Sequence, residues 1–538
     1  MKRIVYGTLD GLSKAQINRI ENLYTIKSPP EYLLSRQAAV EIVAISRDIR
    51  RQVGILLDRN GKVICVIAGE PHRIVIPVTP DFQPGPGRLK GLRCIHTHLS
   101  NETLTRDDLT DLALLRLDYI TAICLNTDGS PGPVYSAHIL PDPEADPYSV
   151  LPASSLDHLD IDCQAQILEL ESELSRHNRR YSPETGQENA FLINAATQGF
   201  SAAQISLDEL DELCKTSRIN VVGTAIQQRK KIDPKFVVGK GKLAELIIKA
   251  IQNYATMLVF DRELSPSQIR SITDFVEMKV IDRTQLILDI FAKQAKSSEG
   301  KYQVELAQLE YMLPRLITKN TAMSRLTGGI GGRGPGETKL EVNRRRARER
   351  INRLKKEIKK IRKQRTQQKA RRKRRNLPVI SIVGYTNAGK STLLNTLTQS
   401  SIIAANRLFA TLDPSSRRLR FPRDKEVIIT DTVGFIQNLP KELLEAFHAT
   451  LEELEQADVI LHVIDISNPR YMQQKETVDQ LLKSLNLNKI PTLYVFNKMD
   501  RADLDNFDSP WLLNQGTLIS AREKSSLAPL VEKLEAMV

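Results

Sequence analysis

The amino-acid sequence predicts a multidomain protein of the α/β fold class, and three observations support this. The chain has 538 residues, more than one domain usually holds, since domains run to roughly 100–200 residues. Two regions, about 190–293 and 377–538, alternate strand-like and helix-like runs, which is typical of parallel sheets covered by helices. Between them lies a strongly basic region with the apolar spacing of a long helix.

Composition narrows the class of protein. With 41% hydrophobic residues the chain can form packed cores, which excludes a mainly disordered protein. No apolar run approaches the ~20 residues of a membrane-spanning helix, and no secretory signal is visible at the N-terminus. The five cysteines are far apart and form no CxxC pair, which fits a reducing compartment. We therefore expect a cytoplasmic protein without a membrane span. We also expect a monomer, which the composition itself does not decide.

Residues 1–145 mix helix and strand signals, which predicts an additional N-terminal α+β domain. Within it the run CIHTHL reads as a strand, so His96 and His98 would share one face of a sheet. Asp107 or Asp108 could complete a zinc site there, with a water as a further ligand. A metallopeptidase is therefore one hypothesis for this domain.

This pattern is similar to the H-x-H…S-x-x-D motif of JAB/MPN metalloproteases and their inactive relatives. Thr105 stands where the motif has a serine, the spacing is about one residue shorter, and Glu41 is only a guess for the upstream acid. These departures favour a metal-free domain of that fold, which would serve regulation or docking.

The next two segments are expected to be a linker and a small domain. Residues 146–189, which include part of the Pro- and Asp-rich run ILPDPEADPYSVLPASS, predict a linker with a short helix. Residues 190–300 predict a small parallel α/β domain, in which the strands FLINAAT, RINVVGTAIQQ, TMLVF and MKVID alternate with helices. One of these helices, SLDELDELCKT, should begin at its serine, which would cap the first turn.

Residues 301–372 predict a helical hairpin. The first helix, 302–318, carries an apolar stripe, and the second carries one at heptad-like spacing, formed by Leu340, Ala347, Ile351, Leu354, Ile358 and Ile361. Between them lies TGGIGGRGPGE, which is longer than a helical turn needs and predicts an exposed tip at a partner surface. The cluster Arg371–Arg375 precedes a strand and is expected to belong to an interdomain linker.

The positive charge of the chain is concentrated in the second of these helices. From Lys339 to Asn376 there are 20 Lys or Arg and 3 Glu, a local charge of +17, whereas the whole chain carries +13. This density exceeds what solubility requires and favours a nucleic-acid partner over a merely solvated helix face. Membrane-surface binding is less favoured, because the apolar stripe is narrow.

Residues 377–538 predict a nucleotide-binding domain. A buried strand leads into the G-x-x-x-x-G-K-S sequence that starts at Gly384 and ends at Ser391, and a helix follows. In this context the backbone N–H groups and the helix N-terminus would bind the α- and β-phosphates. Lys390 would reach the β- and γ-phosphates, and Ser391 would bind Mg²⁺.

Three further motifs favour guanine. The D-x-x-G motif at Asp431 follows the strand EVIIT, and Thr411 is placed to close on Mg²⁺ when the γ-phosphate is present. The NKMD motif follows TLYVF, and the carboxylate of Asp500 can accept hydrogen bonds from N1–H and N2–H₂ of guanine. A Ser-Ala-Arg loop at Ser520 would place a backbone amide near guanine O6. Their order on successive strands predicts a GTPase, with an ATPase of the same fold as the alternative.

The expected nucleotide site is therefore spread over five loops. The residues expected to bind GTP are Gly384, Tyr385, Thr386, Asn387, Ala388, Gly389, Lys390, Ser391, Thr392, Phe409, Ala410, Thr411, Asp431, Thr432, Val433, Gly434, Asn497, Lys498, Met499, Asp500, Ser520, Ala521 and Arg522. The expected Mg²⁺ ligands are Ser391 and Thr411.

Two positions bear on hydrolysis. Phe435 stands where many GTPases have the glutamine that orients the attacking water, so no catalytic residue is assigned. Unaided hydrolysis should be slow or depend on another group, for which Gln437 is a weak substitute. Asn387 resembles the asparagine of GTPases that bind K⁺ beside the phosphates, although it could instead only stabilise the loop.

The joint pattern of GYTNAGKST, FATLDP, DTVGF and NKMD, with GGIGGRGPGE ahead of a basic helix, resembles HflX, a ribosome-associated GTPase family of the Obg–HflX group. The stretch VVGKGKLAEL at Val237–Leu246 also looks like that family, and the resemblance covers about residues 190–538. It implies a P-loop GTPase domain preceded by a small parallel α/β domain with a helical hairpin. Residues 1–145 are then an extra N-terminal α+β domain that the shorter members of the family lack.

The resemblance also implies partners. It implies GTP-dependent binding to the 50S ribosomal subunit and its 23S rRNA, splitting or rescue of 70S ribosomes, and a secondary ATPase activity. A GTP-regulated RNA-binding factor in ribosome assembly or hibernation, without splitting activity, is the alternative. The expected RNA-binding residues lie in the hairpin, whose loop by resemblance reaches toward the peptidyl-transferase region: Gly328, Gly329, Gly331, Arg333, Arg344, Arg345, Arg346, Arg350 and Lys355.

Overall fold

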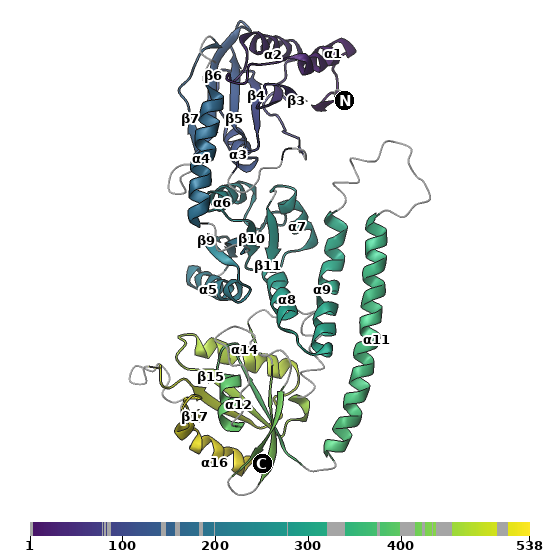
Figure 1. The fold of residues 1–538 in the computed structure, drawn as a ribbon, viewed down its shortest axis with the longest axis vertical. Helices are drawn as coiled ribbons and strands as arrows, with labels where there is room; N and C mark the ends of the chain where they lie inside the picture. Colours follow the sequence, from purple (N-terminus) through teal and green to yellow (C-terminus); the bar gives the residue numbers. More distant parts are fainter. Residues whose placement is uncertain are drawn as a thin grey trace. The chain divides into compact units, whose positions relative to one another are not determined.

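The computed structural model describes most of the chain: residues 4–77, 79, 82, 88–140, 147–156, 162–181, 187–197, 199–276, 278–319, 339–373, 377–398, 415–421, 425–432, 434–436, 454–502 and 515–538. It confirms the α/β class that the sequence predicts (Figure 1). The chain divides into two compact units. The first is Met1–Thr197, Asn220–Leu258 and Ile272–Lys279, and the second is Gln198–Ile219, Val259–Ser271 and Val280–Val538.

The N-terminal part of the first unit is built on a mixed seven-stranded sheet. Its strands, in the order β1-β3-β2-β4-β5-β6-β7, are β1 (Val5–Gly7), β3 (Val63–Ala68), β2 (Val53–Asp58), β4 (Leu92–His98), β5 (Tyr119–Leu125), β6 (Pro131–Ile139) and β7 (Tyr148–Val150). Strand β4 runs parallel to β5 and antiparallel to β2. The helices are α1 (Lys14–Asn22), the short 3₁₀ helix η1 (Leu23–Thr25), α2 (Arg36–Ile49), α3 (Arg106–Leu114) and α4 (Cys163–Tyr181).

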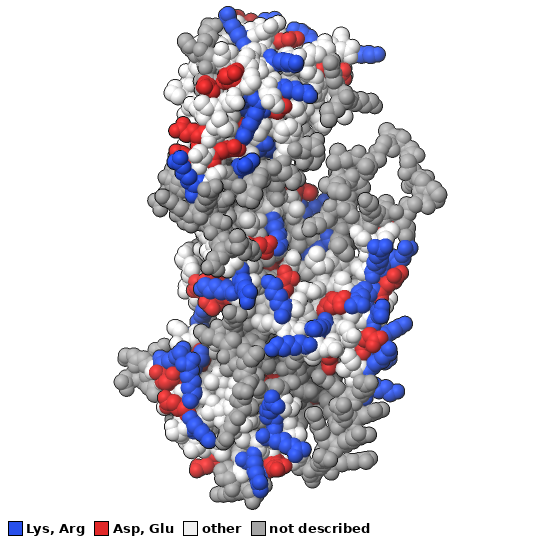
Figure 2. All heavy atoms as spheres, viewed as in Figure 1, with Lys and Arg blue, Asp and Glu red and all other residues white. Residues whose placement is uncertain are grey.

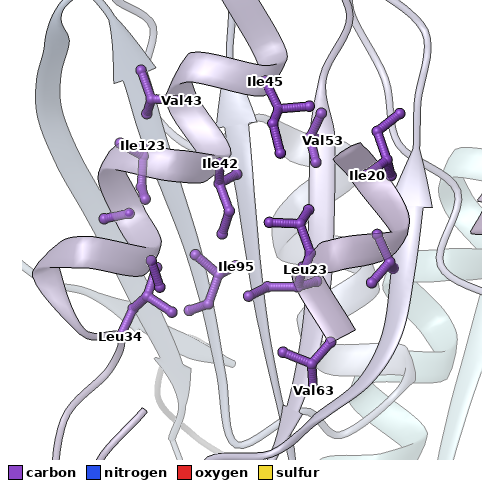
Figure 3. Packing of buried hydrophobic residues seen from close by; sticks show 14 of the residues in the cluster. Ile20, Leu23, Leu34, Ile42, Val43, Ile45, Val53, Val63, Ile95 and Ile123 are labelled. Atoms are coloured by element: carbon purple, nitrogen blue, oxygen red, sulfur yellow. The ribbon is translucent and has the colours of Figure 1, made fainter. Parts of the chain in front are cut away.

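Helices cover both faces of this sheet, because alternate residues of its central strands are apolar on both sides. In β2, Ile55 joins the cluster of α1 and α2, whereas the next residue, Leu56, joins the cluster of α3 and α4. Figure 3 shows part of the first cluster, with Ile42, Val43 and Ile45 of α2 gathered around Val53, Ile95 and Ile123 of the sheet. On β4 the alternation places His96 and His98 on the face of α3 and α4, with Cys94.

The segment expected to be a linker is largely packed. Tyr148–Val150 adds strand β7 to the edge of the sheet, antiparallel to β6. Helix α4 buries Ile167 and Leu170 in the sheet cluster, and its Glu171 forms an ion pair of 2.7 Å with Arg59. The apolar face of α4 therefore belongs to the N-terminal core, and the helix is longer than the sequence pattern indicated.

A four-stranded sheet follows, with the order β11-β10-β8-β9, in which β8 pairs with β9 in parallel. Its elements are β8 (Asn189–Ala196), α5 (Phe200–Thr216), β9 (Asn220–Gln228), α6 (Lys240–Gln252), β10 (Met257–Phe260), α7 (Pro266–Thr273), β11 (Lys279–Asp282) and α8 (Arg283–Gln294). The prediction that the first helix begins at Ser206 is wrong: α5 begins at Phe200 after Gly199. Its buried stripe starts at Ala203 and continues through Leu207 and Leu210, so the helical spacing extends upstream of the serine.

Two long helices of the second unit, α9 (Ser298–Lys319) and α11 (Lys339–Lys373), form the hairpin and lie antiparallel (Figure 1). The apolar part of their contact is formed by Tyr302, Leu306, Leu309 and Leu313 of α9 with Ile351, Leu354 and Ile358 of α11. Helix α11 runs to Lys373, so the basic cluster that starts at Arg371 begins inside the helix and not in a linker. The glycine-rich tip lies outside the described residues.

The C-terminal sheet has six strands in the order β13-β14-β12-β15-β16-β17, all parallel except the edge strand β13. They are β12 (Val379–Gly384), β13 (Ser415–Arg420), β14 (Glu426–Asp431), β15 (Val459–Asp465), β16 (Thr492–Asn497) and β17 (Gly516–Leu518). The helices are α12 (Lys390–Thr398), η3 (Leu454–Gln456), α14 (Tyr471–Ser484), η4 (Lys524–Leu527) and α16 (Ala528–Met537). Strand β13 has no counterpart in the sequence prediction. In the part of the chain that the structure describes, no helix has the length and apolarity to cross a membrane.

Candidate nucleotide-binding site and basic helix

The predicted nucleotide motifs meet at one edge of the C-terminal sheet. Gly384 ends β12, Asp431 ends β14 and Asn497 ends β16, and Ser520 lies just beyond β17. These four strands are parallel, so their carboxyl ends lie along the same edge, where open α/β sheets bind ligands. Four of the five expected loops are thus brought together. Phe409, Ala410, Thr411 and Val433 lie outside the described residues.

The loop after β12 has a backbone that few residue types allow. Gly389 has φ +94°, and a Cβ there would collide with the amide of Asn497. Asn387 has φ +61°, a left-handed conformation that asparagine tolerates better than most residues. The backbone therefore explains the asparagine without an ion, and the K⁺ site stays a prediction.

Lys390 is the first residue of α12, and its ammonium group is buried beneath this loop. It donates hydrogen bonds to the carbonyl oxygens of Gly384, at 3.0 Å, and of Tyr385, at 2.8 Å. Burial lowers the pKa of Lys390 to about 8, although the nearby Asp431 carboxylate acts in the opposite direction. A Cβ on Gly434 would lie 3.0 Å from the Lys390 Nζ, so the D-x-x-G glycine closely approaches this lysine.

Ser391 and Asp431 form an oxygen pair beside the lysine. The Ser391 hydroxyl donates a hydrogen bond of 2.7 Å to Oδ2 of the fully buried Asp431. Thr432 turns its hydroxyl away, to the carbonyl oxygen of Ile382 at 2.7 Å. A hydroxyl and a carboxylate are oxygen donors of the kind that Mg²⁺ prefers, so these two side chains fit a Mg²⁺ site.

Asn497 ties three loops together. Its Nδ2 donates to the carbonyl oxygen of Ala388 at 2.8 Å, and its Oδ1 accepts from the backbone N–H of Ala521 at 2.9 Å. In the loop expected to place a backbone amide near guanine O6, the amide of Ala521 is therefore bonded to Asn497 in this structure. The local sequence pattern did not indicate this role, because it joins residues that are 109 and 24 positions apart.

The other NKMD residues leave one acid accessible. Lys498 has φ +65° and forms an ion pair of 2.6 Å with Asp465 at the end of β15, a partner that the motif alone did not reveal. The side chain of Asp500 is 28% exposed, so its carboxylate is accessible to a ligand. Ser520 has a buried hydroxyl with no hydrogen-bond partner among the described residues.

Phe435 is 3% exposed and cannot orient a water. Its backbone instead holds the phosphate loop, because its carbonyl oxygen accepts from Thr386 N–H at 2.7 Å and its N–H donates to Gly384. Gln437, the weak substitute, lies outside the described residues, so the water-orienting group is not assigned.

A link between this site and helix α5 was not foreseen from the sequence. The hydroxyl of Tyr385, in the phosphate loop, donates a hydrogen bond to the Glu209 carboxylate, 176 residues away in the chain. Glu209 also forms an ion pair with Arg283, which contacts Asp261 at 2.8 Å. Arg470 donates to the carbonyl oxygen of Ile205 at 3.1 Å, so a second contact joins α5 to the same domain.

Among the cations of α11 whose side chains the structure describes, most are exposed, and Figure 2 shows them as a row of blue side chains along the helix. Of the predicted RNA-binding residues, Arg345 and Arg346 are exposed and Arg344 is half-buried. Arg350 and Lys355 form ion pairs of 2.7 and 2.8 Å with Glu305 and Glu310 of α9.

Other cations of α11 are better placed than Arg350 and Lys355 to contact RNA phosphates. Arg346, Arg353 and Lys356 are exposed and form no ion pair with any residue that the structure describes. The heptad stripe could have indicated Arg353 and Lys356, which lie on the face opposite Ile351, Leu354 and Ile358. Gly328, Gly329, Gly331 and Arg333 lie outside the described residues.

Comparison with known proteins agrees with this architecture. A domain model described as "50S ribosome-binding GTPase" matches residues 379–498, and models described as "GTP-binding GTPase N-terminal" and "GTP-binding GTPase Middle Region" match residues 204–292 and 294–372. GTPase HflX of Caldanaerobacter subterraneus subsp. tengcongensis is 47% identical over 330 residues, 61% of this chain and 76% of that relative. GTPase HflX of Escherichia coli is 43% identical over 319 residues, 57% of this chain and 75% of that relative.

Among solved structures, a GTP-binding protein from the archaeon Sulfolobus solfataricus in complex with GDP matches 65% of this chain and 98% of its own, at 23% identity and a TM-score of 0.37.

The parallel sheet, its phosphate loop and the ordered D-x-x-G and NKMD motifs define a P-loop GTPase, an enzyme that binds and hydrolyses GTP. With relatives at 43–47% identity over three quarters of their length, the chain belongs to the HflX family of GTPases, as its motifs indicated.

Proposed function

We propose that GTP bound at the C-terminal sheet controls the binding of helix α11 to RNA of the large ribosomal subunit, and that this cycle separates 70S ribosomes. The observation that carries the proposal is the presence in one compact unit of a GTPase site and an exposed row of cations on a helical hairpin. The match to a 50S ribosome-binding GTPase model supports the choice of partner.

The phosphates would be bound by the loop after β12 and the N-terminus of α12. There Gly434 lies close to both Lys390 and Thr386, since a Cβ on this glycine would come within about 3 Å of each. GTP binding would draw the Lys390 ammonium from the two carbonyl oxygens that it now contacts to the phosphate oxygens. Ser391 would hold Mg²⁺, with Asp431 beside it, and the ion would supply charge that neutralises the phosphates. Thr411 remains a predicted second ligand.

The base would be recognised by the partly exposed carboxylate of Asp500, which lies 3.8 Å from the Arg501 guanidinium and three residues after Asn497. Asp500→Asn tests this role, because an amide offers a donor where guanine also offers N–H groups. We expect GTP binding to be lost and binding of xanthosine triphosphate, whose base has a carbonyl in place of the amino group, to appear. Equal loss of both nucleotides would show that the substitution only disrupts the site.

Hydrolysis by the protein alone should be slow, because buried Phe435 leaves no water-orienting side chain at its position. We expect large ribosomal subunits to stimulate GTP turnover by supplying or ordering the missing group. A secondary ATPase activity and K⁺ dependence remain predictions. Both can be measured in the same turnover assay, with ATP in place of GTP and with K⁺ replaced by Na⁺.

The deciding experiment is sedimentation of 70S ribosomes with the full-length protein and a non-hydrolysable GTP analogue. We expect separated subunits and the protein on the 50S fraction, whereas Lys390→Ala, which lacks the phosphate contact, should leave the particles intact. Binding to intact 70S or 50S particles without dissociation would favour an RNA-binding factor in ribosome assembly or hibernation. Sedimentation of the protein apart from ribosomes with every nucleotide would contradict both.

A further inference from the structure

The N-terminal part of the first unit contains a buried polar cluster that the GTPase cycle does not use. His96 and His98 are two residues apart on β4, so both face the helical layer that contains α3. Asp108 lies in the first turn of α3. The two imidazoles are 0% and 1% exposed, and Asp108 is 8% exposed. Two elements of secondary structure thus bring three potential metal ligands to one point within the domain.

The distances within the cluster match a coordination polyhedron. The Nε2 atoms of His96 and His98 are 3.0 Å apart. The carboxylate oxygens of Asp108 lie 3.2 Å from His96 Nε2 and 3.4 Å from His98 Nε2. Ligand atoms at about 2.0–2.2 Å from a tetrahedral zinc ion are about 3.3–3.6 Å from each other. An ion could therefore sit among these atoms after only small movements of the side chains.

Neighbouring groups already orient two of the three ligands. His98 Nδ1 lies 3.1 Å from the carbonyl oxygen of Glu102, which can only accept, so Nδ1 carries the proton and the neutral ring has its lone pair on Nε2. Oδ2 of Asp108 accepts from the backbone N–H and the hydroxyl of Thr105, both at 2.7 Å. Oδ1 is not bonded to Thr105 and lies 3.2 Å from His96 Nε2, so it is the oxygen placed to bind an ion. Such support of a ligand's other polar atom is typical of metal sites.

A metal-free cluster has to place two imidazole Nε2 atoms 3.0 Å apart beside a buried carboxylate. A proton on one ring can be donated to the other ring or to Asp108, whereas a divalent cation accepts lone pairs from all three side chains at once. Glu41, the guessed upstream acid, lies on α2, which covers the opposite face of the sheet.

We propose that His96 Nε2, His98 Nε2 and Asp108 Oδ1 bind one divalent transition-metal ion of the zinc class. Two imidazoles and a carboxylate suit such ions better than Mg²⁺ or Ca²⁺, which prefer oxygen ligands alone. Three protein ligands leave a further position for water. The ion would join strand β4 to helix α3, and the sequence expectation of a metal-free domain would then be wrong.

The test uses the full-length protein, stripped with a chelator, without nucleotide, and equilibrated with Zn²⁺ or Co²⁺. We expect one equivalent of zinc to remain after gel filtration. His96→Gln and Asp108→Asn should bind zinc at least tenfold more weakly in competition with a chromophoric chelator. Asp107→Asn is the matched control, because it removes the same charge from the neighbouring, exposed residue of α3 and should retain the zinc.

The Co²⁺ form of the unsubstituted protein gives a readout that does not depend on how well the variants fold. We expect the strong visible absorption of four-coordinate Co²⁺, and a higher melting temperature with zinc than without it. The weak spectrum of the hydrated ion, or equal zinc in the unsubstituted protein and His96→Gln, would overturn the proposal and leave a metal-free imidazole–carboxylate pair.

Discussion

At the scale of single residues, Asn497 is the clearest case of a side chain that supports the nucleotide site by holding its loops together. It satisfies the Ala388 carbonyl oxygen and the Ala521 N–H, which belong to two other loops of the nucleotide site. Both groups would be left without these partners if the amide were removed, and an unsatisfied buried polar group costs about 1–3 kcal/mol. The geometry of three loops therefore depends on one amide.

We expect Asn497→Ala to lower the free energy of unfolding by about 2 kcal/mol or more and to weaken GTP binding at least tenfold. Urea unfolding and fluorescent-nucleotide titration measure the two effects. Asn468→Ala is a suitable control, since Asn468 caps a turn after β15 through a single hydrogen bond of 2.9 Å to Arg470 N–H. Similar effects of the two substitutions would contradict the role assigned to Asn497.

His462 gives a pH-dependent prediction. It is buried in β15, and burial lowers its pKa below the usual value, although Asp479 at 3.2 Å acts in the opposite direction. Below about pH 6.5 the histidine of the unfolded chain therefore binds a proton, whereas that of the folded chain does not. The free energy of unfolding should decrease as the pH is lowered, until the pH is below the folded-state pKa as well. The slope should not exceed about 1.4 kcal/mol per pH unit.

His462→Gln should flatten this slope between about pH 7 and pH 5.5, because the amide does not titrate. The check is urea unfolding at a series of pH values, followed by circular dichroism. Asp479 keeps its ion pair of 2.7 Å with Lys475 in this variant. Parallel pH profiles for the two proteins would mean that another group controls the acid sensitivity.

At the scale of elements, Arg283 holds α8 against its neighbours. The guanidinium is 3% exposed and pairs with Glu209 of α5 and with Asp261 beyond β10. Removing one member of a buried charge network leaves the others uncompensated, which usually costs about 3–5 kcal/mol. The network is therefore a point where the packing of three elements depends on one charge.

Arg283→Ala should accordingly destabilise the second unit by about 3–5 kcal/mol. The comparison is Lys279→Ala, because Lys279 forms an ion pair of 2.9 Å with Glu188 in which both side chains are about half exposed. Loss of that pair should cost less than about 1 kcal/mol. Chemical denaturation distinguishes the two, and equal small losses would show that the Arg283 charges are effectively solvated.

Sequence patterns predicted what is local in this protein and missed what is distant. The glycines, Lys390 and Ser391 follow from the spacing of one strand–loop–helix unit, and His96 and His98 follow from the alternation of one strand. The choice of Asp108 over Asp107 needed the structure, because it depends on the turn of α3 that Thr105 caps. The short strand β7 and the Tyr385–Glu209 contact depend on partners far along the chain, which local spacing cannot reveal.

At the scale of the whole molecule, the basic helix sets the dependence of RNA binding on salt. Each phosphate contact releases condensed counterions, so log K changes with log salt by about 0.7–0.9 per contact. Arg346, Arg353 and Lys356 together should supply up to three such contacts. Replacing all three with glutamine should weaken binding to 50S subunits and reduce the salt slope by about 2–3.

The matched control replaces three exposed lysines of the C-terminal domain, Lys483, Lys489 and Lys524, with glutamine, which changes the net charge equally. Binding is measured by co-sedimentation from low to high salt. If both triple variants lose the same slope, the attraction is a property of total charge and not of α11.

Tyr385 in the phosphate loop also limits how the domains of this protein can be exchanged with those of other GTPases. The Tyr385 hydroxyl is bonded to Glu209 of α5, and Glu209 is itself paired with Arg283. The phosphate loop of the C-terminal domain therefore depends on a residue that lies outside that domain. A chimaera that grafts this domain onto the N-terminal half of another GTPase carries the motifs intact, but its tyrosine keeps this bond only if that half places a carboxylate where Glu209 lies. Compatibility of the two halves must therefore be judged at Glu209 as well as at the nucleotide.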